Sequence, residues 1–299
     1  MSLRVLVVGD VMLDVVVKPD VAIAPTSDTP SRVRLHRGGA AANIAEALAR
    51  AGHHVTYVGA SGSDLAAQLF EETLHRAGVE TSLERLDSSS GVVVALVDRE
   101  GERAMMTDRG ANSSLGLDHV LRVLNRSYDH LHVSGYTLLD PSTTDVGRGA
   151  LERARELGLT TSVDVCSVAP LNQMTPAAFM TAATCAGKLF ANEEEALTLS
   201  GGVDVDDAMD RLSKRFNEVV VTRGAHGARA RLDGVDFDVM TTSDVVVDTT
   251  GAGDAATGAY LGARLDGTRP PEALALAMAA SSRVVGGLGA LGALGQSRM

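Results

Sequence analysis

A glycine-rich stretch at residues 248–254, with the sequence DTTGAGD, has the residue types and spacing that suit chemistry on a phosphate group. The β-branched run at 244–247 predicts a buried strand before it, and residues 255–265 predict a helix after it. Glycines let the backbone aim several N–H groups at one point, and a helix N-terminus adds partial positive charge, so the turn predicts an anion site. Asp254 either caps this helix or accepts a proton from a hydroxyl that attacks a phosphoryl group.

The same turn has a second interpretation, because residues 251–256 also fit the G-x-G-x-x-A fingerprint of dinucleotide-binding proteins. That fingerprint requires a further strand and an acidic residue about 20 positions later, inside a βαβ unit. Here the residues that follow predict a second helix over 271–284. A NAD-dependent oxidoreductase is therefore the less favoured alternative to phosphoryl transfer.

Composition and charge narrow the class of protein. The chain has 299 residues, enough for one large α/β domain, and its net charge of −11 disfavours a non-specific nucleic-acid partner. No apolar run reaches the length of a membrane span, and the two cysteines, Cys166 and Cys185, show no close pairing pattern. We therefore expect a cytoplasmic protein with no membrane partner. Since aromatic residues make up only 3% of the chain and Trp is absent, the core must consist of Val, Leu and Ala.

Apolar runs alternate with helical patterns along most of the chain, which predicts a single α/β domain over 1–299 with a mostly parallel central sheet. The run at 4–9 predicts the first strand, buried on both faces. Ligands of open α/β sheets collect beyond the carboxyl ends of the strands, where Asp10 and Asp14 lie. We expect Asp10 to be a solvated loop residue, whereas Asp14 is suited to accept hydrogen bonds from two hydroxyl groups.

Two segments, at about 12–37 and 92–109, interrupt this alternation. Each contains short strand-like pieces, and residues 99–101 between two such pieces predict a hairpin turn. We expect both segments to leave the central sheet.

Two stretches resemble the signatures of the PfkB, or ribokinase-like, family of carbohydrate kinases. Residues 248–254 resemble the second signature, although Ala256 stands where the family usually has Phe, and residues 38–43 resemble the first, Gly-Gly-x-x-x-Asn. Ribokinases proper often carry Lys at the position of Ala40, so this departure puts ribose itself in doubt as the substrate. The resemblance covers about residues 4–292 and implies a three-layer ribokinase-like fold with a small β lid, made from the segments at about 12–37 and 92–109.

The resemblance also implies an ATP-dependent kinase that uses Mg²⁺ and phosphorylates a sugar-type hydroxyl. Asp254 would be the general base. The backbone N–H groups that would hold the γ-phosphate belong to Gly251, Ala252 and Gly253. The residues that would bind the acceptor are Asp14, Gly38, Gly39 and Asn43.

Two weaker motifs follow in the order that the family shows. An Asn-x-x-Glu motif and a Thr-x-Gly loop imply ATP contacts at Asn192, Thr222, Gly224 and Gly227. Glu195 would act on Mg²⁺ through water, although acidic residues are favourable at any helix start. A potassium site, where relatives have one, would use Asp248 and Thr250.

The acceptor is less well defined than the reaction. Arg109 ends the second lid segment and is either a surface-paired charge or a fork for a carboxylate or phosphate on the acceptor. We expect a sugar or sugar acid, with a nucleoside as the alternative within the family. A non-catalytic sugar or nucleotide sensor is the alternative of another class. The resemblance further implies a homodimer that forms through the lid.

Overall fold

The computed structural model describes residues 2–98, 103–240 and 251–285, and every structural statement below refers to these ranges. The strand expected at 244–247 lies outside them, as do Asp248 and Thr250.

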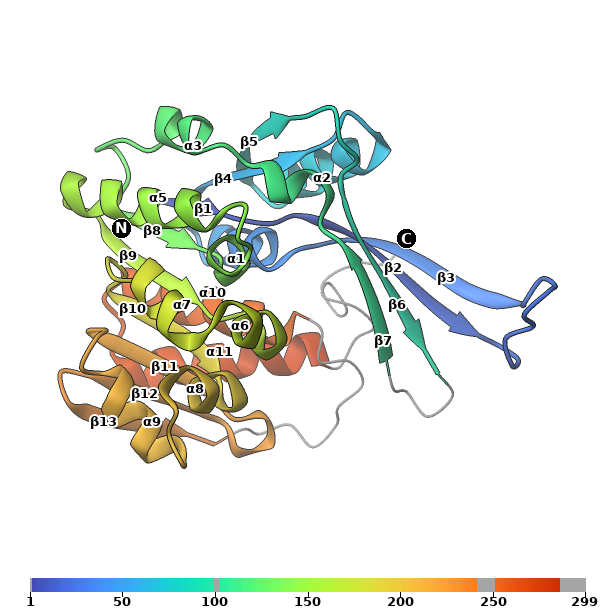
Figure 1. Ribbon diagram of the computed structural model, residues 1–299. Coiled ribbons are helices and arrows are strands. Elements are labelled where there is room, and N and C mark those ends of the chain that lie inside the picture. Colours follow the sequence, from blue (N-terminus) through green and yellow to red (C-terminus); the bar gives the residue numbers. More distant parts are fainter. Residues whose placement is uncertain (1, 99–102, 241–250, 286–299) are drawn as a thin grey trace.

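A mostly parallel sheet forms the centre of the described structure (Figure 1). Nine strands lie in the order β13-β12-β11-β10-β9-β8-β1-β4-β5, and the neighbouring pairs are parallel except β11–β12 and β12–β13. The bounds are Arg4–Val8 (β1), His54–Ser61 (β4), Val79–Arg85 (β5), His130–Val133 (β8), Thr160–Asp164 (β9), Lys188–Asn192 (β10), Glu218–Thr222 (β11), Ala228–Leu232 (β12) and Val235–Val239 (β13).

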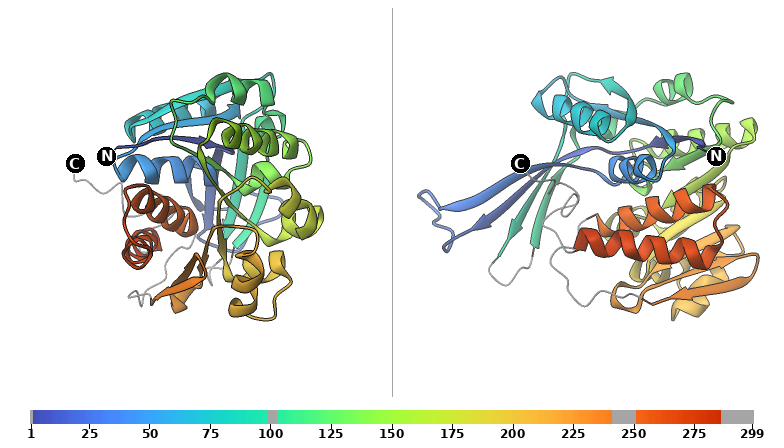
Figure 2. Two further views of the ribbon diagram at one scale, coloured as in Figure 1. Left: turned by 90° about the vertical axis from the view of Figure 1, so that its left-hand side faces the viewer. Right: turned by 180° about the vertical axis from the view of Figure 1, so that it is seen from behind.

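Helices cover both faces of this sheet (Figure 2). One layer consists of α1 (Ala40–Arg50), α2 (Leu65–Arg76), α10 (Ala252–Leu265) and α11 (Pro270–Val285). The other consists of α3 (Leu117–Val123), α4 (Gly135–Leu139), α5 (Thr144–Leu157), α6 (Val168–Met174), α7 (Pro176–Ala182), α8 (Glu193–Ser200) and α9 (Val205–Leu212). Two short 3-10 turns are η1 (Gly110–Ser114) and η2 (Gly224–His226).

The first strand shows why the apolar runs are continuous. Val5 and Val7 pack into the core under α1 and α10, whereas Leu6 and Val8 pack into the core under α3 and α5. All four side chains are fully buried, because successive residues of a strand point to opposite faces and both faces are covered by helices.

Helices α1 and α10 approach each other along a seam of small residues. A Cβ on Gly258 would lie 2.4 Å from Cβ of Ala47, and a Cβ on Gly262 would lie 2.9 Å from Cβ of Ala51. Since real Cβ atoms do not come this close, the two helices can pack at this distance only because α10 carries glycine at both positions. The seam brings the start of α1 beside the start of α10.

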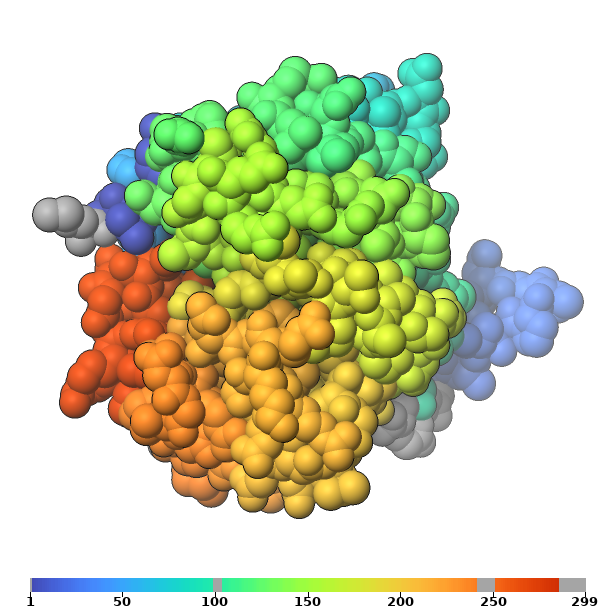
Figure 3. Space-filling view, turned by 60° about the vertical axis from the view of Figure 1, so that its left-hand side comes forward, coloured from blue at the N-terminus to red at the C-terminus, as the bar shows by residue number. Residues whose placement is uncertain are grey.

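A separate sheet of four strands extends from the body, in the order β3-β2-β6-β7 (Figure 1). Its strands are β2 (Met12–Pro19), β3 (Ser31–Gly38), β6 (Gly91–Val97) and β7 (Arg103–Asp108). The space-filling view shows the part of this sheet near the turn after β2, in blue, projecting beyond the face that the α3–α9 layer covers (Figure 3).

The predicted fold class is confirmed, including the smaller second sheet. The main strand that the sequence analysis did not predict is β5. It lies at the edge of the sheet, pairs only with β4, and its sequence VETSLER has few apolar residues. The short helices α4, α6, α7 and α9 were also not expected. In the described ranges, no helix combines the length and apolar character that a membrane crossing requires.

Candidate active site

The turn at Gly251 forms the N-terminus of α10. Gly251 is the N-cap residue and has φ +76°, in the left-handed region that favours glycine. Gly253, two residues later, faces open space, because a Cβ built on it would meet nothing within 4 Å. The first N–H groups of α10 have no partner one turn earlier in the helix, so the turn can donate several hydrogen bonds to an anion placed beside Gly253.

Asp254 lies in the first turn of α10, and its Oδ2 accepts a hydrogen bond from Nδ2 of Asn43 at 2.8 Å. Its side chain makes no cap hydrogen bond, since Gly251 is the N-cap, so the interpretation of Asp254 as the cap residue is wrong. Burial raises the pKa of Asp254 to about 7; the Asn43 amide lowers it, while nearby carboxylates, led by Asp164, raise it further. A carboxyl group with this pKa can exchange a proton at neutral pH.

The glycines of the first signature permit close approach of other groups. A Cβ on Gly38 would lie 2.2 Å from Oδ2 of Asp14, so the Asp14 carboxylate packs directly against the Gly38 backbone. Gly39, the N-cap of α1, has φ +95°, and a Cβ there would lie 2.6 Å from the carbonyl oxygen of Asp10. The structure therefore brings Asp14 and both glycines together at the start of α1, four residues before Asn43.

Asp10 is not the solvated loop residue that we expected. Only 4% of its surface is exposed, and its carboxylate accepts hydrogen bonds from the Ala40 N–H at 3.1 Å and from the Ser134 hydroxyl at 3.0 Å. Its role is therefore structural, because it binds the free N–H groups in the first turn of α1.

On the other side of the turn at Gly251, Asn192 and Thr222 end the neighbouring parallel strands β10 and β11, where they stand opposite each other. Both line a cavity of about 250 Å³ that Asp254 also lines. Further lining residues are Asp164, Cys166, Glu195, Gly251 and Gly253. This arrangement follows the rule that ligand sites lie beyond the carboxyl ends of parallel strands.

Gly224 and Gly227 lie just past this cavity, on the 3-10 turn η2 and directly after it. Both have positive φ, of +53° and +81°. They form the turn between β11 and β12.

Glu195 lies in the first turn of α8 and also lines the cavity beside Asp254. Its Oε2 accepts the Asn192 N–H at 2.9 Å, and Oδ1 of Asn192 accepts the Glu195 N–H at 2.8 Å, so the two residues form a capping box. Burial raises the pKa of Glu195 to about 7; the Asn192 N–H lowers it, and the charge of Asp164 raises it. The helix-start interpretation is therefore correct for this residue, and it does not conflict with a second role.

The same cavity suits a hard divalent cation. Asp164 and Glu195 line it with carboxylate oxygens, which are the ligands that Mg²⁺ prefers. Within the described ranges, no group of three or more His, Cys, Asp or Glu side chains is arranged to hold a metal by itself. Mg²⁺ keeps several waters and binds substrate phosphates, so it does not need such a protein cage.

Asp164, at the end of β9, was not anticipated as a site residue. Burial raises its pKa, but His132, the Cys166 thiol and the Gly135 N–H lower it more, so the pKa of Asp164 lies below its usual value. Its position at the carboxyl end of a parallel strand is the signal that could have identified it.

Behind Asp164, two buried histidines of β8 are joined through one serine. The Ser162 hydroxyl lies 2.8 Å from Nε2 of His130 and 2.8 Å from Nδ1 of His132, and Nε2 of His132 lies 3.5 Å from Oδ1 of Asp164. Burial, more than any neighbouring charge, lowers the pKa of His130 well below its usual value, so its imidazole is neutral.

Arg109, which follows β7, makes an ion pair. Its Nε donates to Oδ2 of Asp140 at 2.9 Å, and its guanidinium lies 5.5 Å from the centre of the Tyr136 ring. It does not line the cavity beside Asp254. The structure thus gives Arg109 a protein partner and leaves its contact with an acceptor a prediction.

The comparisons with known proteins agree with this geometry. The model of the pfkB family carbohydrate kinases matches residues 2–294. The ATP-dependent ribose-1-phosphate kinase of Halopiger xanaduensis is 29% identical over 295 residues, which cover 96% of this chain and 93% of that protein.

Two solved structures show the same fold. The adenosine kinase of Sinorhizobium meliloti superposes with a TM-score of 0.87 at 23% identity, covering 97% of this chain and 96% of that one. The ribokinase of Arabidopsis thaliana, complexed with ribose and ATP, superposes with a TM-score of 0.79 at 22% identity, covering 97% and 94%. The chain therefore belongs to the pfkB family of carbohydrate kinases and is a phosphotransferase.

Proposed function

We propose that this protein transfers the γ-phosphoryl group of ATP to a hydroxyl of a sugar or sugar acid, with Asp254 as the general base. One observation carries the proposal: the Asp254 carboxyl group lies one residue after Gly253, on a glycine turn that faces open space, and accepts a hydrogen bond from Asn43. Burial raises its pKa to about 7. The full-length similarity to a sugar-phosphate kinase supports it.

In the proposed reaction, Asp254 accepts the proton of the acceptor hydroxyl as that oxygen bonds to the γ-phosphorus, and the bond from this phosphorus to the leaving ADP oxygen breaks. The N–H groups of Gly251, Ala252 and Gly253 hold the phosphoryl oxygens in place. Mg²⁺, when bound with ATP, offsets the phosphate charge. Glu195 and Asp164 are the residues that would hold Mg²⁺ through its water ligands, and its positive charge would favour the ionised form of Glu195.

We assign ATP to the side of the turn where Asn192 and Thr222 end their strands, with Gly224 and Gly227 shaping the loop beside it. Asp14, Gly38, Gly39 and Asn43 lie together on the opposite side, next to the small sheet, and we assign them to the acceptor. Potassium at Asp248 and Thr250 stays a prediction, since both residues lie outside the described ranges.

A panel of acceptors tests this function. ADP release should be measured with ribose, ribose 1-phosphate, fructose, aldonic sugar acids and adenosine at equal concentration. We expect the fastest turnover with a sugar or sugar acid. Adenosine as the best acceptor would show a nucleoside kinase, and no ADP release with any acceptor, in the presence of bound ATP, would show a sensor.

We also propose that the small sheet is the lid and that two copies of the chain pair through it. The strand register places a set of apolar residues on one face of this sheet: Val15, Val17, Val33, Leu35, Val94, Leu96 and Met106. Of these, Val33, Leu35 and Met106 are more than half exposed, at 57%, 59% and 55%. An apolar sheet face of this kind is typical of an interface between protein chains.

The charge and the separated cysteines favour a cytoplasmic location.

A further inference from the structure

The largest fully buried side chain of the described ranges belongs to Arg37, and the reaction proposed above does not use it. Arg37 is 1% exposed and lies near the end of β3, directly before the glycines of the first signature. Burying a guanidinium is unfavourable unless its N–H groups are paired, so its partners indicate what it does.

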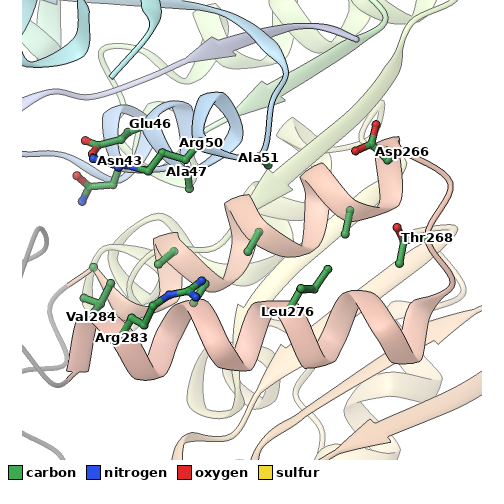
Figure 4. A pocket seen from close by; sticks show the side chains of 15 residues that line it. Asn43, Glu46, Ala47, Arg50, Ala51, Asp266, Thr268, Leu276, Arg283 and Val284 are labelled. Carbon is green, nitrogen blue, oxygen red and sulfur yellow. Dashed lines mark hydrogen bonds and ion pairs between the residues drawn. The ribbon is translucent and has the colours of Figure 1, made fainter. Parts of the chain in front are cut away.

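The partners of Arg37 form a chain that ends at Asp254. One terminal nitrogen of Arg37 donates to Oε2 of Glu46, and the other donates to Oδ1 of Asn43 at 3.0 Å. Nδ2 of Asn43 donates to Oδ2 of Asp254 at 2.8 Å. The far side of Glu46 is bound by Arg50, whose Nε and terminal nitrogen donate to Oε1 at 3.0 and 2.7 Å. Figure 4 shows Asn43, Glu46 and Arg50 in succession on α1, beside the groove that α1 forms with α10 and α11.

The chemistry of arginine fixes the direction of this chain. A guanidinium has donors only, so the atom of Asn43 that faces Arg37 must be the amide oxygen. The amide nitrogen must then face Asp254, where it donates to the carboxylate and stabilises its ionised form. Without Arg37, the Asn43 amide could turn over and place its oxygen against the carboxylate.

We propose that Arg37 is a positioning residue of the phosphoryl transfer: it holds the Asn43 amide in the orientation that donates to the catalytic base. This inference depends on the proposed role of Asp254. Because Arg37 belongs to β3 and Asn43 to α1, the orientation of the amide is also tied to the small sheet.

The other charged and titratable groups that influence Asp254 act against its ionised form. Asp10, Asp164 and Glu195 each raise its pKa through their charges, and burial does the same. The charge of Asp254 acts in turn on the Tyr136 hydroxyl. Among the described residues, the Asn43 amide is the contact that favours the base form, so its orientation matters more here than in a site with several donors.

The test compares Arg37→Met with Arg50→Met, the same substitution at the two arginines that donate hydrogen bonds to Glu46. We expect Arg37→Met to move the acidic limb of the kcat/KM pH profile upward by about one unit, because a hydrogen bond to a charged group is lost. At pH 6, kcat/KM of Arg37→Met should be up to about tenfold below that of the wild type, and it should recover above pH 8. Arg50→Met should leave the limb unchanged. The titration of ATP is the same in every variant, so the difference reports on the protein.

Arg37→Met leaves Glu46 paired with Arg50, which favours a folded protein, and a thermal melt verifies this. The double variant Arg37→Met/Glu46→Met removes both buried charges and should show the same shift. An unchanged acidic limb in both variants, with Asp254→Asn inactive, would overturn the role of Arg37 alone. Near-normal turnover of Asp254→Asn would overturn the proposed base and, with it, this inference.

Discussion

Nδ2 of Asn43 donates to Oδ2 of Asp254 at 2.8 Å, although 211 residues separate the two along the chain. The contact joins the two family signatures, one at the start of α1 and the other at the start of α10. It places the amide that we assign to acceptor binding directly against the proposed base. The predictions below test what each group around this contact does.

Asp254→Asn should retain ATP binding and lose turnover by ~10²–10⁴-fold, the usual contribution of a general base. The amide cannot accept the hydroxyl proton, whereas the N–H groups of the glycine turn are unchanged. Steady-state kinetics and nucleotide titration measure the two effects separately. A variant with near-normal kcat would assign Asp254 no part in proton transfer.

The same variant should be more heat-stable than the wild type at pH 8. Burial raises the pKa of Asp254 to about 7 in the folded protein, whereas in the unfolded chain it is near 4. The folded protein therefore loses stability as the pH rises from about 4 through 7. Asparagine avoids this loss and can still accept the Asn43 hydrogen bond. Melting curves at pH 4.5 and pH 8 should show a difference between the two proteins that grows with pH.

Glu195→Gln should raise the Mg²⁺ concentration for half-maximal rate roughly 10-fold, as substitutions around a metal's ligands often do. The glutamine oxygen can still accept the Asn192 N–H, so the α8 cap and the melting temperature should be kept. Glu194→Gln, on the exposed neighbour, is the matched control. Equal metal dependence in both variants would leave Glu195 as a helix cap only.

Gly253→Ala should fold normally and lose activity. Its added Cβ would enter open space, and alanine is favourable in a helix, so stability should be equal or slightly higher. With ATP bound, that space should hold the phosphoryl group, and kcat should fall at least tenfold. Gly258→Ala is the opposite case, because its Cβ would meet Ala47 at 2.4 Å, and it should lower the melting temperature. An active Gly253→Ala enzyme would place the phosphate elsewhere.

Arg109→Ala should raise the KM of the acceptor more than the KM of ATP, if the acceptor carries a carboxylate or phosphate. The guanidinium would have to share itself between Asp140 and that anion. Arg126→Ala, at an exposed position, is the control. Ribose as the clear best acceptor, with Arg109→Ala kinetically silent, would show that Arg109 is only an ion-pair partner.

Leu35→Asp should shift the protein from dimer to monomer in sedimentation or light scattering. It places a charge on the apolar face of the small sheet, opposite Val15. Arg34→Asp, on the neighbouring position whose side chain points to the other face, should leave the dimer intact. A wild-type protein that is monomeric at micromolar concentration would contradict the proposed interface.

The sequence predicts those site residues that lie in a short, glycine-containing stretch of the chain. Asn43 and Asp254 each lie beside glycines whose backbone demands are local. Asp164 ends a predicted strand, so its position could have been recognised. The contacts of Arg37 and Asp10 could not. The partners of Arg37 are only six and nine residues away but depend on how α1 follows β3, and the partners of Asp10 come from far along the chain. The burial of Asp10, for example, depends on Ala40 and Ser134, which lie 30 and 124 residues away.

The seam between α1 and α10 has a consequence for the accuracy of the site. Gly258 and Gly262 on one helix, and Ala47 and Ala51 on the other, carry no group that could take part in chemistry, yet they set the separation of the two helices. Asn43 and Asp254 lie in the first turns of those helices, so the seam sets the distance between them. The small side chains of the seam thus act as a spacer between the two helices. The length of the hydrogen bond from Asn43 to Asp254 depends on them.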